Sequence, residues 1–157
     1  MWRTASSWPL TGTPKSPASI KKHMDDYQDA AKRHFDDAEL LFAHSSPRLA
    51  NASHLFGISA ECSVKAIARK FNLNARFKGG KGHIPLLFTE LCNVAPAIAG
   101  NAALAGQIVG LSHHFGSWDV NQRYESQSTF VPAIVLQEQK GATEAHLLMT
   151  NFLSGLI

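Results

Sequence analysis

The sequence predicts an all-α protein, an up-and-down bundle of four to five helices. Apolar residues recur at helical spacing in several long stretches, and no stretch alternates as a half-buried strand would. The 157 residues are 45% hydrophobic and 17% charged, which suits one globular domain with its own core. We expect that domain to cover residues 20–157. A flexible, disordered N-terminal arm, rich in Ser, Thr and Pro, precedes it over residues 1–19.

The first two helices are the best defined. Apolar side chains within residues 20–43 occupy roughly a third of the helix circumference, and charged ones take the other side. A second long helix follows a short turn, with Ser46 as N-cap, Pro47 at the first helical position and an end near Phe71. Because the turn is short, the two helices should form an antiparallel hairpin.

The second helix carries a polar line opposite its core stripe. At about 100° per residue, His54, Glu61 and Lys65 fall together on that face. Glu61 and Lys65 are four residues apart, so an ordinary ion pair on a solvated face is one interpretation. The other places both residues in a dimer cleft beside Arg123. The residues alone leave the two interpretations open.

The segment over residues 72–83 is glycine-rich and electropositive. It combines three glycines with four cationic or titratable side chains, among them Arg76 and His83. A solvated loop is the simpler interpretation, and contact with phosphate is the alternative. The segment does not match a Walker phosphate-binding loop, because Gly82 is followed by His83.

Three helices are expected in the second half of the chain. The first covers residues 85–93, Pro96 interrupts, and a helix of small residues follows over residues 97–114. Small residues recur there at every fourth position, which lets another backbone approach closely. They are Ala102, Gly106 and Gly110. The last helix covers residues 130–154 and places Glu138 on its inner stripe.

Residues 117–125 form an aromatic and charged connection before the last helix. For Trp118 and Tyr124, packing in the core or at an interface is the simpler interpretation, and base stacking is the alternative. Arg123 lies between these aromatic residues in a connecting segment, where its guanidinium is well placed to meet phosphate. It is the leading candidate for a functional residue.

Composition limits the function classes. A net charge of +3 and a pI near 9.0 permit an acidic partner such as RNA without requiring one. Cys62 and Cys92 lack metal-ligand spacing and read as reduced thiols of a cytoplasmic protein. The N-terminus lacks a signal-peptide pattern, and polar residues interrupt the least polar stretch. We therefore expect a soluble protein without a metal, a cofactor or a membrane contact.

Several short motifs resemble the HEPN superfamily, the small helical domains of prokaryotic toxin–antitoxin and defence systems. Glu61 and Lys65 are similar to an acid and a lysine four residues apart on the family's second helix. Residues 82–87 resemble the His-x-x-x-Leu opening of its next helix, and residues 118–124 resemble the Arg-Tyr segment ahead of its last helix. The likeness spans roughly residues 30–157.

The resemblance implies a specific chemistry. Active members are metal-independent endoribonucleases whose dimer brings an Arg and a His from each chain into one cleft, where they act on the RNA phosphate. Their signature is an Arg followed by a His in a late helix, with about four to six residues between them. This chain departs from it. The positions at that distance beyond Arg123 are Ser128, Thr129 and Phe130, and His114 precedes Arg123.

The resemblance therefore implies a non-catalytic, HEPN-like homodimer that binds RNA, a nucleotide or a partner protein such as a nucleotidyltransferase. A ribonuclease with a displaced histidine, using His114, Arg123 and Tyr124, is the second hypothesis. A structural interaction module with the Gly/Ala helix as dimer face is the third. The ligand-binding candidates are Glu61, Lys65, Arg76, His83, Trp118 and Arg123.

Overall fold

The computed structural model describes residues 25–73, 82–99 and 102–156. These residues form α-helices and short 3₁₀ helices without a strand, which confirms the all-α prediction. The α-helices are α1 (Tyr27–Ala43), α2 (Leu49–Lys70), α3 (Leu86–Ala99), α4 (Ala102–Ser112) and α5 (Pro132–Leu153), and the 3₁₀ helices are η3 (His113–Phe115), η4 (Val120–Tyr124) and η5 (Gln127–Thr129). None of the described helices is long and apolar enough to span a membrane. The predicted arm over residues 1–19 and the candidate Arg76 lie outside the described residues.

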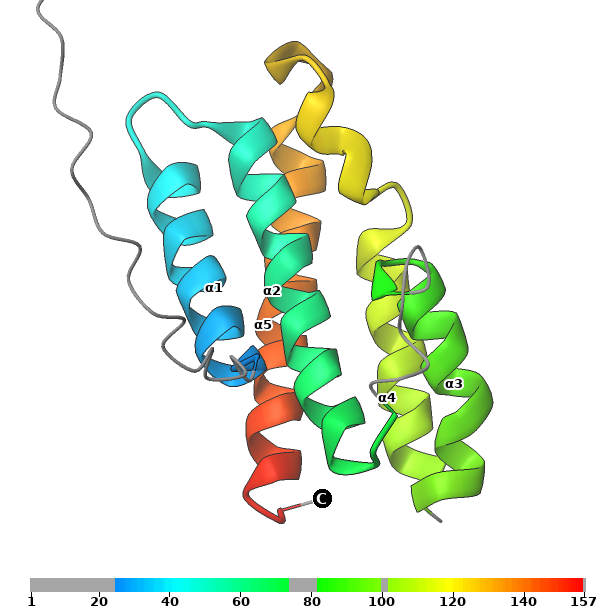
Figure 1. Cartoon of the computed structure of the whole chain (residues 1–157). Helices are drawn as coiled ribbons and strands as arrows, with labels where there is room; N and C mark the ends of the chain where they lie inside the picture. Colours follow the sequence, from blue (N-terminus) through cyan, green and yellow to red (C-terminus); the bar gives the residue numbers. More distant parts are fainter. Residues whose placement is uncertain (1–24, 74–81, 100–101, 157) are drawn as a thin grey trace, which may run out of the picture.

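Helix α2 is the centre of the bundle. It packs most extensively on α1 and α5, and Figure 1 shows these three helices side by side. The α3–α4 pair lies beyond α2, on the side away from α1 (Figure 1). Phe56, Val64 and Ile67 of α2 are buried, and burying each such side chain contributes about 1.5–3 kcal/mol. The predicted hairpin of the first two long helices is therefore the framework on which the rest of the chain packs.

Helix α1 begins later than predicted. Asp26 is its N-cap, and the Asp26 carboxylate accepts the backbone N–H of Asp29 at 3.1 Å. This bond satisfies one of the free N–H groups of the first turn. The helix ends at Ala43, as expected.

The start predicted for α2 is wrong by two residues. The N-cap is Arg48 rather than Ser46, and Pro47 stays outside the helix. The turn has its own hydrogen bonds, because the Ser46 N–H donates to Nδ1 of His44 at 3.0 Å and the Arg48 N–H donates to the Leu41 carbonyl at 3.0 Å. These bonds close the turn against α1 and delay the first turn of α2.

The predicted break at Pro96 is also wrong, because α3 continues through it to Ala99. A proline inside a helix removes one backbone hydrogen bond. Helix α3 packs along α4, and tertiary packing regularly overrides local propensity. The last helix is close to its prediction, since α5 begins two residues later and ends one residue earlier than expected.

Two glycines allow elements to pack closely on α2 and α5. A Cβ at Gly57 would lie 1.9 Å from the indole of Trp118, and a Cβ at Gly141 would lie 2.4 Å from Cβ of His114. Real side chains do not approach this closely, so only glycine fits at either position. The connection between α4 and α5 is thereby pressed against the central helices.

The close approach predicted along α4 does not occur within the described chain. A Cβ at Gly106 or Gly110 would meet no atom within 4 Å. Helix α4 turns this small-residue side outwards, while Leu104, Ile108 and Leu111 are buried. The tight glycine contacts therefore lie on α2 and α5 instead.

Candidate functional site

One face of α2 carries the predicted polar line, and this face is partly covered by the protein itself. His54, Glu61 and Lys65 lie along it at helical spacing. Trp118 stacks on His54, and His83 binds Glu61. Only 2% of the Glu61 side chain is exposed. The interpretation of a solvated face therefore does not hold for Glu61, because the second half of the chain folds back over it.

The Glu61 carboxylate is held by three neighbours. Nζ of Lys65 donates to Oε1 at 3.2 Å, and Nδ1 of His83 lies 3.1 Å from both carboxylate oxygens. The backbone N–H of Ile84 donates to Oε2 at 3.1 Å. A buried carboxylate is tolerated when its oxygens are paired in this way. The cluster ties the residues just before α3 to the middle of α2.

The partners of His83 indicate which of its ring nitrogens carries the proton. A carboxylate only accepts hydrogen bonds, so we assign the proton to Nδ1 of His83, which leaves Nε2 as the acceptor of the neutral ring. About 39% of the His83 side chain is exposed. A histidine oriented by a carboxylate can take up and release a proton at Nε2. Glu61, Lys65 and His83, all candidates from the sequence, therefore form one polar cluster.

Trp118 is a core residue, as the simpler interpretation held. Its side chain is 2% exposed, and the indole N–H donates to the Ser53 carbonyl at 3.1 Å. The ring lies nearly parallel to His54, with 5.9 Å between the centroids. It therefore presents no free face for stacking with a base in this structure.

Arg123 and Tyr124 are presented differently, on the outer side of η4. Tyr124 is 77% exposed, and the Arg123 guanidinium lies 4.8 Å from the centroid of the Tyr124 ring. This is a cation–π arrangement. Among the described residues, no acidic side chain forms an ion pair with Arg123. The guanidinium and the exposed ring are both available to a ligand.

His54 is the residue that sequence reasoning placed on the polar line but did not propose for the site. Burial lowers its pKa, and the nearby positive charge of Arg123 lowers it further. Its Nδ1 is buried and has no hydrogen-bond partner within the described part of the chain. Arg123 lies 69 positions away in the sequence, and the spacing gives no sign that η4 returns to this turn of α2.

His114 belongs to a different surface. Its Nε2 lies 3.1 Å from Oε2 of Glu144 on α5. Within the described ranges, no hydrogen bond or ion pair connects His114 or Arg123 to the Glu61 cluster. The structure thus groups Glu61 with Lys65 and His83, and Arg123 with Tyr124, but it does not bring all of the candidates into one place.

Neither thiol chemistry nor a metal centre is favoured by the geometry. Burial raises the pKa of the Cys62 thiol to about 11, so the thiol stays protonated and is a poor nucleophile. Cys62 and Cys92 are both free cysteines. Within the part of the chain that the structure describes, no three His, Cys, Asp or Glu side chains are grouped to hold a metal ion.

The charge of the chain is unevenly distributed. All 12 acidic residues lie in the described ranges, together with only 8 of the 15 Lys and Arg residues. The remaining basic residues belong to residues 1–24 and 74–81, which contain no acid. The described helices therefore carry an excess of negative charge, and an anionic ligand would need local cationic groups such as Arg123.

No protein-family model, curated protein or solved structure matches this chain. The resemblance to the HEPN superfamily therefore stays a prediction.

Proposed function

We propose that this chain is a HEPN-like dimeric module that binds single-stranded RNA without cleaving it. The observation that carries the proposal is the exposed pair of Arg123 and Tyr124 on η4. A base can stack on an exposed tyrosine, which contributes about 1–3 kcal/mol per base in single-strand binding. The adjacent guanidinium can bind a phosphate in bidentate fashion. The two side chains together match the base and the phosphate of one nucleotide.

The positions of the histidines support binding without cleavage. Metal-independent cleavage needs a proton-transfer group and a cation at the same phosphate. His83 is oriented by Glu61, and Glu61 lies seven residues along α2 from His54, about 10 Å at 1.5 Å per residue. His54 is close to Arg123, but it is half-buried and its Nδ1 lacks an orienting partner in the described chain. No described histidine therefore combines orientation with a position beside Arg123.

Replacing Arg123 or Tyr124 with alanine should each weaken RNA binding about tenfold, since each removes an interaction worth about 1–3 kcal/mol. The Arg123→Ala variant should also lower the salt dependence of binding by about one phosphate contact. Fluorescence anisotropy with a labelled single-stranded RNA in EDTA, at several salt concentrations, measures both effects.

Lys140→Ala is the matched control, because Lys140 is an exposed cation on α5 that lies on one surface with His113 and His114 of η3. The affinity of the Lys140→Ala variant for RNA should stay close to that of the unaltered protein. Equal losses in Lys140→Ala and Arg123→Ala would mean that general surface charge, rather than the η4 pair, holds the RNA.

A metal-independent ribonuclease is the second candidate, and the contact between Glu61 and His83 favours it. A second copy of the chain would have to place its Arg123 beside His83 for this chemistry. RNA incubated with the protein in EDTA would then be cut to products ending in a cyclic phosphate, and His83→Ala would abolish the cleavage. Our first proposal predicts that the RNA stays intact both with the unaltered protein and with the His83→Ala variant.

An interaction module without a nucleic-acid ligand is the third candidate. The open side of α4 around Gly106 and Gly110 favours it, because small residues let a partner helix approach closely. Such a module would bind a second copy or a partner protein, for which a nucleotidyltransferase remains our suggestion. If this third candidate is correct, the protein should form a stable dimer that neither binds nor cuts RNA.

A further inference from the structure

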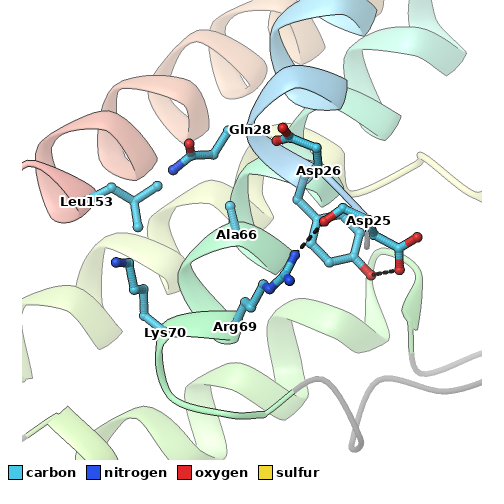
Figure 2. A pocket seen from close by; sticks show the side chains of 8 residues that line it. Asp25, Asp26, Gln28, Ala66, Arg69, Lys70 and Leu153 are labelled. Carbon is cyan, nitrogen blue, oxygen red and sulfur yellow. Dashed lines mark hydrogen bonds between the residues drawn. The ribbon is translucent and has the colours of Figure 1, made fainter. Parts of the chain in front are cut away.

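A cavity lies at the end of the bundle where the start of α1 meets the last turns of α2 and α5. Its volume is about 490 Å³, and Figure 2 shows the side chains around it. Arg69, on its wall, is 15 residues along α2 from His54, which corresponds to about 22 Å. The cavity is therefore separate from the η4 surface to which we assign RNA binding.

The two acidic residues of this cavity already have partners. The Asp26 carboxylate caps α1 by accepting the N–H of Asp29. The Asp25 carboxylate accepts the hydroxyl of Tyr27 at 3.4 Å and points away from the space between Gln28 and Lys70 (Figure 2). Neither carboxylate forms an ion pair with Arg69 or Lys70.

The two cationic side chains of the cavity form no ion pair with a described acid. The Arg69 guanidinium donates one N–H to the backbone carbonyl of Asp25, which fixes its position and leaves its other donors free of described partners. Lys70 forms no hydrogen bond or ion pair with any described residue. Figure 2 shows Lys70 and the amide of Gln28 directed from two helices into the same space.

The remaining walls are apolar. Ala66 forms the base, and Leu153 closes the side towards α5 (Figure 2). Tyr27 also lines the cavity. The volume of the cavity is in the range of small-molecule sites, and its lining is more polar than in most of them.

We propose that this cavity binds a small organic anion, a phosphate or carboxylate group carried on an apolar body. Lys70, Arg69 and Gln28 would hold the anionic group with charge-assisted hydrogen bonds. The apolar body would lie against Ala66 and Leu153. The site requires neither RNA nor a second copy of the chain, so it stands independently of the function proposed above.

Binding of phenyl phosphate, benzoate and neutral benzamide to the full chain tests this proposal by NMR titration. We expect saturable binding of at least one anion with a Kd of about 1 mM or tighter, at least tenfold tighter than that of benzamide. The ratio of the two anion affinities shows whether phosphate or carboxylate is preferred. Equal binding of benzamide, or no saturation by either anion, would overturn the proposal.

Lys70→Gln is the decisive variant, because Lys70 is exposed and its side chain forms no hydrogen bond or ion pair with a described residue. It should weaken anion binding about tenfold. Lys140→Gln should not weaken it, because Lys140 does not line the cavity. The NMR shifts of the residues around the cavity, rather than those of Arg123 and Tyr124, report this binding, which separates the site from the η4 surface. Unaltered affinity in Lys70→Gln would show that the anion binds elsewhere.

Discussion

Replacing Gly57 with alanine should destabilise the protein by about 3–5 kcal/mol, the cost of displacing a buried tryptophan from its site. The added Cβ would lie 1.9 Å from Cε2 and 2.1 Å from Nε1 of Trp118. The indole cannot move aside at low cost, because it is 2% exposed and donates a hydrogen bond to Ser53. Thermal unfolding should show a Tm lower by about 10 °C or more.

Gly106→Ala is the matched control in another helix. A Cβ at Gly106 meets nothing within 4 Å, so the change should be neutral or should stabilise the helix by about 0.5–1 kcal/mol. A Gly57→Ala protein as stable as this control would mean that Trp118 is not seated against α2 as described.

The second large effect is expected from Glu138→Gln, which should make the protein more stable at pH 8 and leave it nearly unchanged at pH 4.5. Glu138 is 2% exposed at the interface of α5 with α2. Burial raises the pKa of its carboxyl from 4.5 to about 7, and the nearby Ser53 hydroxyl offsets this shift only in part. One carboxylate oxygen has no hydrogen-bond partner in the described chain.

The direction of this change in stability follows from the protonation of Glu138 in the folded and the unfolded chain. Below pH 4.5 the carboxyl is protonated in both states, so it causes no loss of stability. Between pH 4.5 and about 7 the unfolded chain ionises first, and the free energy of unfolding falls as the pH rises. Above pH 7 the full loss is about 3 kcal/mol. A neutral glutamine removes this loss, so the two proteins should differ most above pH 7.

Urea unfolding at pH 4.5 and pH 8 measures the difference between the two proteins at each pH. Glu125→Gln is the control, because Glu125 is exposed on the connection before α5 and should show no such dependence. A constant difference at both pH values would show that Glu138 titrates as an ordinary exposed carboxyl.

Much of the fold could be predicted from the periodicity of apolar residues. The all-α class, the hairpin of α1 and α2, and the inward position of Glu138 are confirmed. The errors fell where local signals compete with long-range contacts. Ser46 and Pro47 favour a helix start, but the turn forms other hydrogen bonds, and Pro96 is overridden by packing along α4.

The candidate site was harder to predict, because its partners are distant in the sequence. The spacing of Glu61 and Lys65 gave their ion pair, and nothing in that spacing showed that His83 returns to Glu61. A polar line on a helix wheel does not reveal whether another segment will cover it. The contact between Arg123 and Tyr124 follows from their adjacency in the sequence. That either residue binds a ligand remains a prediction.

The buried anchor at Glu61 has a consequence for the cooperativity of the molecule. Helices α3 and α4 pack chiefly on one another, whereas α2 packs chiefly on α1 and α5. The contacts of Glu61 with His83 and Ile84, together with the packing of α4 on α5, thus join two units that each have their own internal packing. Opening of the α3–α4 unit would cost less free energy than global unfolding, so local fluctuations would begin there and leave the three-helix framework intact.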